Sequence, residues 1–507
     1  MPEYHAPGVY VEEVERGPKP IEGVSTSTAG FLGETERGRT GARLVTSFPE
    51  FRRKYGGFVE NRYLAYAVEG FFSNGGGRCY VGRVTAATDV ATATLLDAED
   101  ENVLEVTAVG PGSWGGNVAV IVEDATLFKQ DENQLFKLTV QYWTEMEDAP
   151  DDATDAEIVA LQDDPDHEKV YDNLSPDESS SDYYETRLND ISDYVTVGRK
   201  GLGRPVNETS LLTVSDDDGT VTVDHYKGVD TPGERTGLAA FEAIDGISIV
   251  CAPDQAIPAL FDLTEELITH CENLTDRFAV IQAKQNAGPT GSLAPPHDSS
   301  YAAFYYPWIR IRDPVTNNPK LVPAGGHITG IYARSDVRKG VHKAPANEVV
   351  RGAQELQLSI TKEEQAVLNP KGVNCIRSFP GRGIRLWGAR TMSSDPEWKY
   401  VNVRRLFIYL RGSIDRGTQW VVFENNDERL WARVRQTITN FLTRVWEDGA
   451  LMGTTPEEAF FVKCDRSTMT QDDIDNGRLI CEIGVAPVKP AEFVIFRISQ
   501  STGGAEA

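Results

Sequence analysis

Two stretches of the sequence carry residue types and spacings that are typical of a chemical site. Residues 110–115 (GPGSWG) match the glycine pattern of dinucleotide-binding loops. Such a loop binds phosphate at a helix N-terminus, whereas an apolar strand pattern follows here at residues 117–122. Residues 216–219 (DDDG) resemble part of a calcium loop, but Val214 stands at the first ligand position and no glutamate closes the loop. We therefore expect no nucleotide site, and a hairpin turn at residues 216–219.

The histidines, serines and cysteines show no spacing that is typical of catalysis or of metal binding. None of the seven histidines forms an HxxxH or HExxH pattern, and no GxSxG nucleophile motif is present. A Ser-His-Asp triad can still be assembled from residues that are distant in sequence. The six cysteines form no CxxC pair, which is typical of reduced, mostly buried thiols in a cytosolic product. We expect no catalytic residues, no metal and no cofactor.

The net charge of −27 is unevenly distributed. Residues 1–300 carry −32, and residues 301–507 carry +5. This acidity argues against nucleic-acid binding, which needs a basic face, and fits either a halophilic source or a solubilising coat. The asymmetry predicts that the acidic part faces solvent and that the C-terminal part faces a partner. No apolar run approaches the roughly 20 residues that span a bilayer, and we expect no secretory signal and no membrane insertion.

Two separated stretches, 26–85 and 236–360, share an α/β pattern. Strand patterns at residues 29–33 and 78–84 flank a largely helical stretch at 48–72. Farther on, a buried strand at 246–251, a helix with Leu263, Leu267, Ile268 and Cys271 on one face, and a strand at 277–282 form a βαβ unit. We predict a parallel sheet covered by helices, with a further helix at residues 322–336.

Residues 86–235 interrupt this pattern with strands at 104–109, 117–122 and 136–142. They predict a small antiparallel β domain inserted into the α/β core. Between residues 144 and 193 stand 18 acidic residues and only two basic ones, Lys169 and Arg187. Because such a stretch has little to bury, we expect a solvated, partly mobile excursion on the outer surface.

Residues 361–490 predict an α+β C-terminal domain. Strand patterns occur at 400–410, 459–463 and 479–485, and residues 427–447 form the longest amphipathic helix pattern, with Asp427 as N-cap and Gly449 after its end. Its predicted apolar face comprises Leu430, Trp431, Val434, Ile438, Phe441, Leu442 and Val445. The opposite stripe comprises Arg429, Arg433, Gln436, Asn440 and Arg444. This stripe is either a solvated helix face or a docking surface for an acidic partner.

Each end of the chain carries a short strand pattern that is isolated by prolines. In the N-terminal arm, residues 1–25, the pattern is centred on Val9, Tyr10 and Val11. In the C-terminal arm, residues 491–507, Pro487 and Pro490 precede an apolar run. That run comprises Phe493, Val494, Ile495, Phe496 and Ile498. A short strand needs partners for its backbone N–H and C=O groups, and the pattern alone leaves open whether the N-terminal one pairs with the chain's own sheet.

Several long ordered motifs resemble those of contractile tail sheath proteins. They are GHITGIYARSD at 326–336, KAPANE at 343–348, GRGIRLWGART at 381–391, WKYVNVRR at 398–405, FFVKCD at 460–465, DDIDNGR at 472–478 and PVKPAEF at 487–493. Residues 4–13 (YHAPGVYVEE) resemble the N-terminus of that family. The likeness covers about residues 1–80 and 237–500 and excludes the acidic insertion.

The resemblance implies a structural protein whose α/β core is called subtilisin-like for its fold, without protease activity. It implies that both arms add to the C-terminal sheets of neighbouring subunits, and that hexameric rings of this chain stack into a helical sheath around an inner tube protein. The sheath would contract from a metastable extended state and contact baseplate and terminal cap proteins. It would assemble in the cytoplasm as part of a virus tail or a released tail-like particle, with the 429–444 stripe facing the tube. The alternatives are a hydrolase on a subtilisin-like core and a non-contractile tube or capsid protein.

Overall fold

The computed structural model describes residues 20–129, 134–150, 152–215, 218–288 and 291–496. The expected strand at Val9, Tyr10 and Val11, the last arm position Ile498, and residues 216–217 lie outside this range. The chain divides into two compact units, one of residues 25–405 and one of residues 1–24 with 406–507. Each unit is described by itself.

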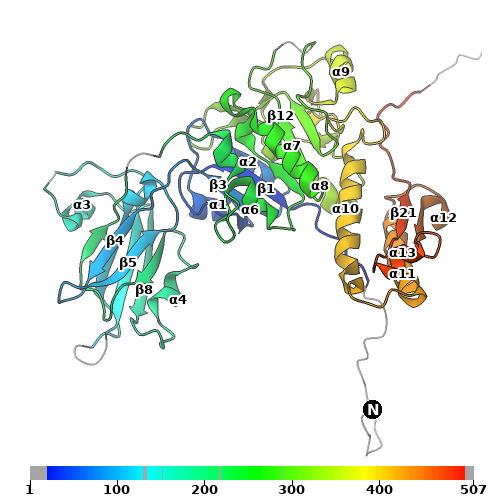
Figure 1. Ribbon diagram of the computed structural model, residues 1–507. Helices are drawn as coiled ribbons and strands as arrows, with labels where there is room; N and C mark the ends of the chain where they lie inside the picture. The colour runs from blue at the N-terminus through cyan, green and yellow to red at the C-terminus, as the bar shows by residue number, and fades with distance from the viewer. Residues whose placement is uncertain (1–19, 130–133, 151, 216–217, 289–290, 497–507) are drawn as a thin grey trace, which may run out of the picture. The chain divides into compact units, whose positions relative to one another are not determined.

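The first unit is built on a nine-stranded mixed sheet (Figure 1). Its strand order is β16 (Glu348–Val349), β19 (Gly383–Leu386), β18 (Val373–Phe379), β13 (Ala302–Tyr306), β12 (Phe278–Gln282), β11 (Ile249–Cys251), β1 (Ala29–Glu34), β3 (Cys79–Val84) and β2 (Arg43–Val45). The strands from β18 to β3 run parallel, and the outer strands pair antiparallel. The parallel sheet predicted from the βαβ unit is confirmed.

Helices cover both faces of this sheet. On one face, α6 (Gly237–Glu242) and α7 (Leu263–Leu274) pack on side chains such as Leu32, Ala279 and Phe304. On the other face lie α2 (Leu64–Ser73), which follows α1 (Phe48–Tyr55), and α8 (Gly325–Lys339). Phe31 of β1 contacts Phe71 of α2 edge to face at 5.3 Å. The helices expected at 48–72 and 322–336 are confirmed.

Helices α2 and α8 approach each other closely because glycines line their contact. A Cβ atom at Gly326 would lie 2.2 Å from the Ala67 carbonyl oxygen, and one at Gly330 would lie 2.5 Å from that of Phe71. Both contacts are with backbone, which cannot move aside cheaply. The glycines of the 326–336 motif therefore set the distance between these two helices.

The insertion forms two antiparallel sheets over one shared core (Figure 1). One contains β10 (Thr209–Leu211), β6 (Val118–Asp124), β7 (Phe136–Tyr142) and β8 (His167–Leu174). The other contains β4 (Thr92–Leu96), β5 (Asn102–Ala108) and β9 (Val195–Arg199). The antiparallel β domain is confirmed. The GPGSWG stretch leads through a short 3-10 turn (Ser113–Asn117) into β6, so no α-helix N-terminus follows it.

The acidic stretch 144–193 differs from the expected solvated excursion. It contains α3 (Asp155–Leu161), the strand β8 and α4 (Tyr184–Leu188). Tyr171, Leu174, Tyr184 and Leu188 from this stretch are buried in the core of the insertion. The expectation was wrong because composition counts charges, whereas a few apolar side chains on β8 and α4 are enough to complete a core.

Three further features depart from the sequence analysis. Strands β18 and β19 lie beyond residue 360 yet belong to the large sheet of the first unit. Helix α5 (Val223–Lys227) lies before residue 236, yet its Tyr226 is buried in the α/β core. Residues 400–410, expected as a strand, begin the 18-residue helix α10 (Val401–Thr418). This stretch is buried nearly all round, so its apolar run had no helical period to reveal it.

The first unit also contains α9 (Lys362–Leu368) and a small sheet of β15 (Pro319–Val322), β14 (Ile309–Arg312) and β17 (Glu355–Leu356). The second unit holds α10 from Leu406 onward, α11 (Glu428–Glu447), α12 (Pro456–Ala459), β20 (Phe460–Lys463), α13 (Gln471–Asp475) and β21 (Glu482–Val485). The two strands predicted near 459–463 and 479–485 are confirmed, and they pair with each other antiparallel.

Candidate assembly surface

Helix α11 has the two faces that its sequence predicted. Asp427 caps it, accepting hydrogen bonds from the backbone N–H groups of Arg429 (3.1 Å) and Leu430 (2.8 Å). Past the other end, Gly449 takes a φ of +78°. All seven residues of the predicted apolar face are buried. The whole predicted polar stripe is exposed.

The exposed stripe is partly engaged within its own unit. The Arg433 guanidinium lies 3.8 Å from a Glu424 carboxylate oxygen and 4.5 Å from the centre of the Trp420 ring. Gln436 donates to Asn440 at 2.8 Å. In the part of the chain that the structure describes, the Arg429 guanidinium has no ion-pair partner. The stripe therefore keeps free hydrogen-bonding capacity mainly at its N-terminal end.

Unlike the other residues of the stripe, Arg444 binds the first residues of the described chain. Its Nη2 donates to the Ile21 carbonyl oxygen at 2.7 Å. Ile21 is buried, and the backbone N–H of Val24 donates to Ser413 Oγ on α10 at 3.1 Å. Gly23 lies so close to Tyr409 that a Cβ there would be 2.4 Å from the phenol oxygen. Residues 21–24 are thus a fixed anchor on α10 and α11, from which the N-terminal arm departs.

The sheet of β20 and β21 has two strands only among the described residues, so each strand has an open outer edge. Its register pairs Phe460 with Val485 and Lys463 with Glu482. Beyond β21 the chain continues along residues 450–452, ending with a hydrogen bond from Val488 N–H to the Ala450 carbonyl oxygen at 3.1 Å. Open strand edges present unpaired N–H and C=O groups that accept a further strand.

The described part of the C-terminal arm exposes consecutive apolar side chains. The exposed fractions are 72% for Phe493, 68% for Val494, 79% for Ile495 and 85% for Phe496. None of these residues belongs to a strand or helix of its own subunit. Scattered exposed apolar residues are common on proteins, but four in succession mark a surface for another molecule.

One exposed apolar feature was missed by the sequence analysis. In the loop between α10 and α11, Phe423 is fully exposed and has a φ of +68°, beside Val422 at 59% exposure. A bulky residue with a left-handed backbone is rare and costs about 1 kcal/mol or more. No sequence pattern predicts this exposure, because the sequence does not distinguish a single exposed phenylalanine in a polar loop from a partly buried one.

The long motifs of the first unit act as anchors around the first turns of α10. Arg405 donates from Nη1 and Nη2 to the two carboxylate oxygens of Asp336 at 3.0 and 2.7 Å, and from Nη2 to the Thr26 carbonyl oxygen at 2.8 Å. Both side chains are at most 3% exposed. Burial raises the pKa of Asp336, and the attraction of Arg405 opposes that shift. This pair joins α8 to α10.

Neighbouring motif residues support the same junction. The Arg404 guanidinium stacks 3.5 Å from the centre of the Trp398 ring and donates to Ser300 Oγ at 2.7 Å. Asn402 Nδ2 donates to the His342 carbonyl oxygen at 2.8 Å. The WKYVNVRR motif therefore attaches the first turns of α10 to the α/β core.

The insertion is joined to the α/β core through Arg37. Its Nη2 donates to the Tyr194 hydroxyl at 2.8 Å, and its guanidinium carbon lies 4.8 Å from the centre of the Tyr142 ring. Glu36 receives hydrogen bonds from Arg37 Nη1 and from the Tyr142 hydroxyl, both at 2.7 Å. Since Tyr142 and Tyr194 come from the insertion, one buried arginine and its neighbour hold the two parts together.

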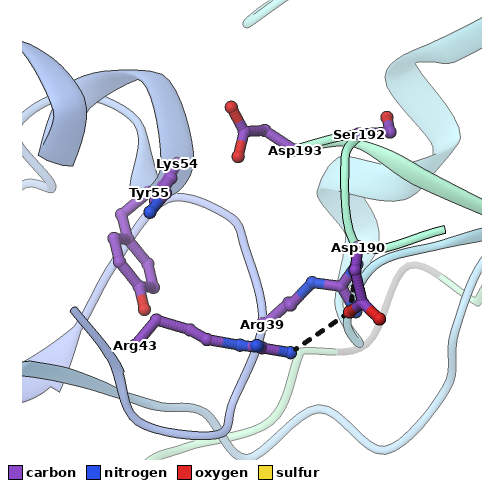
Figure 2. Close-up of a pocket in the computed structure, with 7 residues that line it drawn as sticks. All are labelled: Arg39, Arg43, Lys54, Tyr55, Asp190, Ser192 and Asp193. Carbon is purple, nitrogen blue, oxygen red and sulfur yellow. Dashed lines mark ion pairs between the residues drawn. The ribbon is translucent and has the colours of Figure 1, made fainter. Parts of the chain in front are cut away.

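Beside this joint lies a cavity of about 90 Å³ (Figure 2). Its walls are formed by Arg39, Arg43, Lys54 and Tyr55 of the core and by Asp190, Ser192 and Asp193 of the insertion. Asp190 lies 4.0 Å from the Arg39 guanidinium and 3.7 Å from that of Arg43. Lys54 pairs with Glu50 at 2.8 Å. Because these charges compensate one another, we assign the cavity to the joint and to no ligand.

Titratable groups elsewhere in the described chain are used for packing. Burial lowers the pKa of His327 to about 4, and its ring lies against Gly70 at the contact of α2 and α8. Among the described residues, no group of three or more His, Cys, Asp or Glu is placed to hold a metal ion. No helix in those residues is long and apolar enough to cross a membrane.

Comparison with known proteins defines the class of this fold. Residues 219–392 match the family model of the phage tail sheath protein central domain, and residues 393–501 match that of the phage tail sheath C-terminal domain. Together these matches cover more than half of the chain. The chain belongs to the phage tail sheath family. It is a contractile tail sheath protein, which makes it a structural protein and sets aside the hydrolase and tube or capsid alternatives.

Individual relatives agree with this assignment. A putative prophage major tail sheath protein of Pseudomonas aeruginosa is 24% identical over 283 residues, which are 54% of this chain and 70% of that protein. The tail sheath protein of Salmonella phage ViI is 29% identical over 194 residues, which are 38% of this chain and 30% of that protein. The matched segments thus span from less than a third to about two thirds of these relatives.

Solved structures share the fold over nearly the whole chain. The sheath of the extracellular contractile injection system PVC, in its contracted state, has a TM-score of 0.58 at 22% identity and covers 99% of each chain. The sheath tail protein Lin1278 of Listeria innocua has a TM-score of 0.60 at 12% identity, covering 92% of this chain and 96% of that one. These likenesses include the insertion and the β20–β21 sheet, but show the fold alone.

Proposed function

We propose that this chain polymerises into a helical sheath by donating its terminal arms to the β20–β21 sheets of neighbouring subunits. The observation that carries this proposal is the exposed run Phe493–Phe496, which has strand-forming side chains and no strand partner in its own subunit. Open edges on β20 and β21 offer matching backbone groups. Pro487 and Pro490 interrupt strand pairing between β21 and the run, which sets the run apart from the sheet of its own subunit and favours donation to a neighbour.

The N-terminal arm is proposed to leave from the anchor at residues 21–24, with Val9, Tyr10 and Val11 forming the donated strand. Arg444 and Ser413 fix this exit point on the C-terminal unit. The C-terminal arm leaves the same unit a few residues after β21. A contact in which one surface of a subunit binds a different surface of the next generates rings or open helices, and repeated in two directions it gives a mesh.

We further propose that hexameric rings of this chain stack around an inner tube protein and contact baseplate and terminal cap proteins. Solved relatives are a sheath complex in the contracted state and a baseplate of the anti-feeding prophage. The extended sheath is held by a kinetic barrier, and new contacts between subunits supply the work of contraction. Assembly takes place in the cytoplasm, and the product is a virus tail or a released tail-like particle. We also propose that the α/β core has a subtilisin-like arrangement of its helices and strands.

The exposed stripe of α11 is the proposed contact with the tube. Arg429 and Arg433 are its most available cations, whereas Gln436 and Asn440 bond to each other and Arg444 is committed to Ile21. The exposed positive charges of Arg429 and Arg433 favour an acidic partner surface.

The arm model is tested by removing residues 491–507 and following assembly by sedimentation and negative-stain microscopy. We expect folded, soluble subunits that form no sheath. A matched pair of point variants, Val494→Pro and Ile495→Pro, refines the test. In an added edge strand, alternate N–H groups point to the partner, so one proline should block assembly and the other should be tolerated. Normal sheaths from the shortened chain would contradict the model.

A further inference from the structure

Two cysteines that are 17 residues apart in sequence meet across the β20–β21 sheet. Cys464 directly follows β20, and Cys481 directly precedes β21. The register pairs Lys463 with Glu482, so the next opposed pair in the antiparallel ladder is Cys464 and Cys481. Directly opposed residues in such a ladder have Cα atoms about 4.5–5.5 Å apart, within the range that a disulfide requires.

The side chains as well as the backbone bring these thiols together. The two thiols are hydrogen-bond partners. Just beyond them, Thr468 Oγ1 donates to the Ile480 carbonyl oxygen at 2.8 Å, which keeps the two chain segments side by side. From α11, Arg435 Nη1 donates to the Cys464 carbonyl oxygen at 3.3 Å. All six cysteines are free thiols in this structure.

The two thiols differ in accessibility and in pKa. Cys464 is fully buried, and Cys481 is partly exposed. The hydrogen bond from Cys481, followed by the positive charge of Arg435, lowers the pKa of Cys464, and the same hydrogen bond raises the pKa of Cys481. The remaining cysteines differ, because burial raises the pKa of Cys251, Cys271 and Cys375 to about 12 and raises that of Cys79 further.

We propose that Cys464 and Cys481 are a redox-active dithiol that closes to a disulfide across β20 and β21. The oxidant is a small disulfide of the glutathione type. Cys481, the accessible member, loses its proton and attacks this disulfide as a thiolate. The attack forms a mixed disulfide and releases one small thiol. Cys464, as thiolate, then attacks the Cys481 sulfur and expels the second small thiol. Two protein thiols and one small disulfide become one protein disulfide and two small thiols, which carry away both protons.

The disulfide has a defined structural effect. It closes the loop of residues 464–481, which contains α13, and so restricts the unfolded chain more than the folded one. It also fixes the ends of both strands that, under the function proposed above, receive the arms of neighbours. Formation of the disulfide itself does not depend on that proposal. A subunit made in a reducing compartment would acquire it on transfer to oxidising surroundings.

The test uses the purified full-length chain, first reduced and then equilibrated in reduced and oxidised glutathione. Peptide mapping by mass spectrometry is expected to show one intramolecular Cys464–Cys481 disulfide and loss of two thiols, with the four buried cysteines unchanged. Adding dithiothreitol should restore both thiols. The midpoint of thermal unfolding is expected to rise by about 5 °C or more on oxidation.

Two single variants separate the roles of the thiols. Cys464→Ser should leave Cys481 to accumulate as a mixed disulfide with glutathione, whereas Cys481→Ser should leave Cys464 largely unmodified because it is buried. If Cys464→Ser takes up glutathione but the unaltered chain forms no internal disulfide, the inference is overturned. A disulfide between two copies, seen as a dimer on a non-reducing gel, would also overturn it. The arm-deleted chain should oxidise equally well, so failure of the assembly model leaves this result untouched.

Discussion

Arg405 and Asp336 form a bidentate ion pair that is almost completely buried, with N–O distances of 3.0 and 2.7 Å. The same arginine binds the Thr26 carbonyl oxygen, so three segments that are far apart in sequence converge on one guanidinium. Its position in the second turn of α10 makes it the place where the long helix is fixed to the α/β core. In a sheath, whose parts transmit force, the attachment of α10 to the α/β core must not shift.

Breaking this pair should be costly, whereas replacing it should be tolerated. Asp336→Ala leaves a buried cation without a partner and should lower the free energy of unfolding by about 3–5 kcal/mol. The double variant Asp336→Leu with Arg405→Met should recover most of this loss. Urea unfolding of the single and double variants measures the coupling. The half-buried pair Glu50 and Lys54, one helical turn apart on α1, serves as the control and should couple by only about 0.3–0.5 kcal/mol. Equal coupling in the two pairs would show that burial does not matter here.

The insertion should be removable as a whole but not in part. A Cβ atom at Gly219 would lie 3.2 Å from the Ala86 Cβ, so the two ends of the insertion meet. Replacing residues 88–217 by a short Gly-Ser linker should therefore leave assembly and contraction intact. Excising residues 145–193 removes β8 and α4 with their buried tyrosines, and should give an aggregating chain. Negative-stain microscopy and solubility distinguish the two. Loss of sheaths after clean removal of the whole domain would show that the insertion takes part in assembly.

Charge reversal on α11 should separate tube binding from folding. Arg429→Glu with Arg433→Glu should abolish assembly of the sheath on purified tube while leaving the unfolding midpoint within about 2 °C, because both side chains are exposed. Arg444→Glu should instead lower stability, since it loses its bond to Ile21. Co-sedimentation with tube and thermal unfolding are measured for all variants. Unchanged tube binding by the double variant would rule out the stripe as the contact.

Asp254 gives the α/β core a defined dependence on pH. Burial raises the pKa of its carboxyl to about 6, although Tyr63 N–H and the Tyr226 hydroxyl donate to it at 2.7 and 3.0 Å. Because the folded state keeps a proton that the unfolded state has lost, this stabilisation is present below about pH 4 and is lost as pH rises through about 6.

The amide side chain of Asp254→Asn cannot lose a proton, so the variant should become more stable relative to the unaltered protein as pH rises. From pH 4 to 7.5 the difference in the free energy of unfolding should change by about 3 kcal/mol in favour of the variant. Urea unfolding at several pH values measures it. Asp298→Asn is the control and should change in the opposite sense, because hydrogen bonds from Ser394 lower the pKa of that carboxyl. A pH-independent difference for Asp254→Asn would mean that the carboxylate stays ionised in the fold.

Local pattern was enough to determine much of this protein. The period of 3.6 residues placed seven of the eight buried residues of α11, all but Thr437, and its cap at Asp427, because a helix repeats its environment within a few residues. Three of the seven described strands of the insertion, β5, β6 and β7, and the βαβ unit followed from similar short patterns, and the long motifs indicated the family.

Other features were decided by contacts between distant segments, which no local period records. Residues 400–410 are buried or half-buried at every position, so their apolar run showed no helical period and predicted a strand. The acidic stretch 144–193 folds because five of its side chains complete a core supplied by other strands; they are Tyr171, Leu174, Tyr183, Tyr184 and Leu188. The pairing of Cys464 with Cys481, and of Arg444 with Ile21, depends on strand register and helix packing. The sequence by itself determined many of the elements and the two faces of α11, and the tertiary structure decided the remaining elements and which faces and thiols meet.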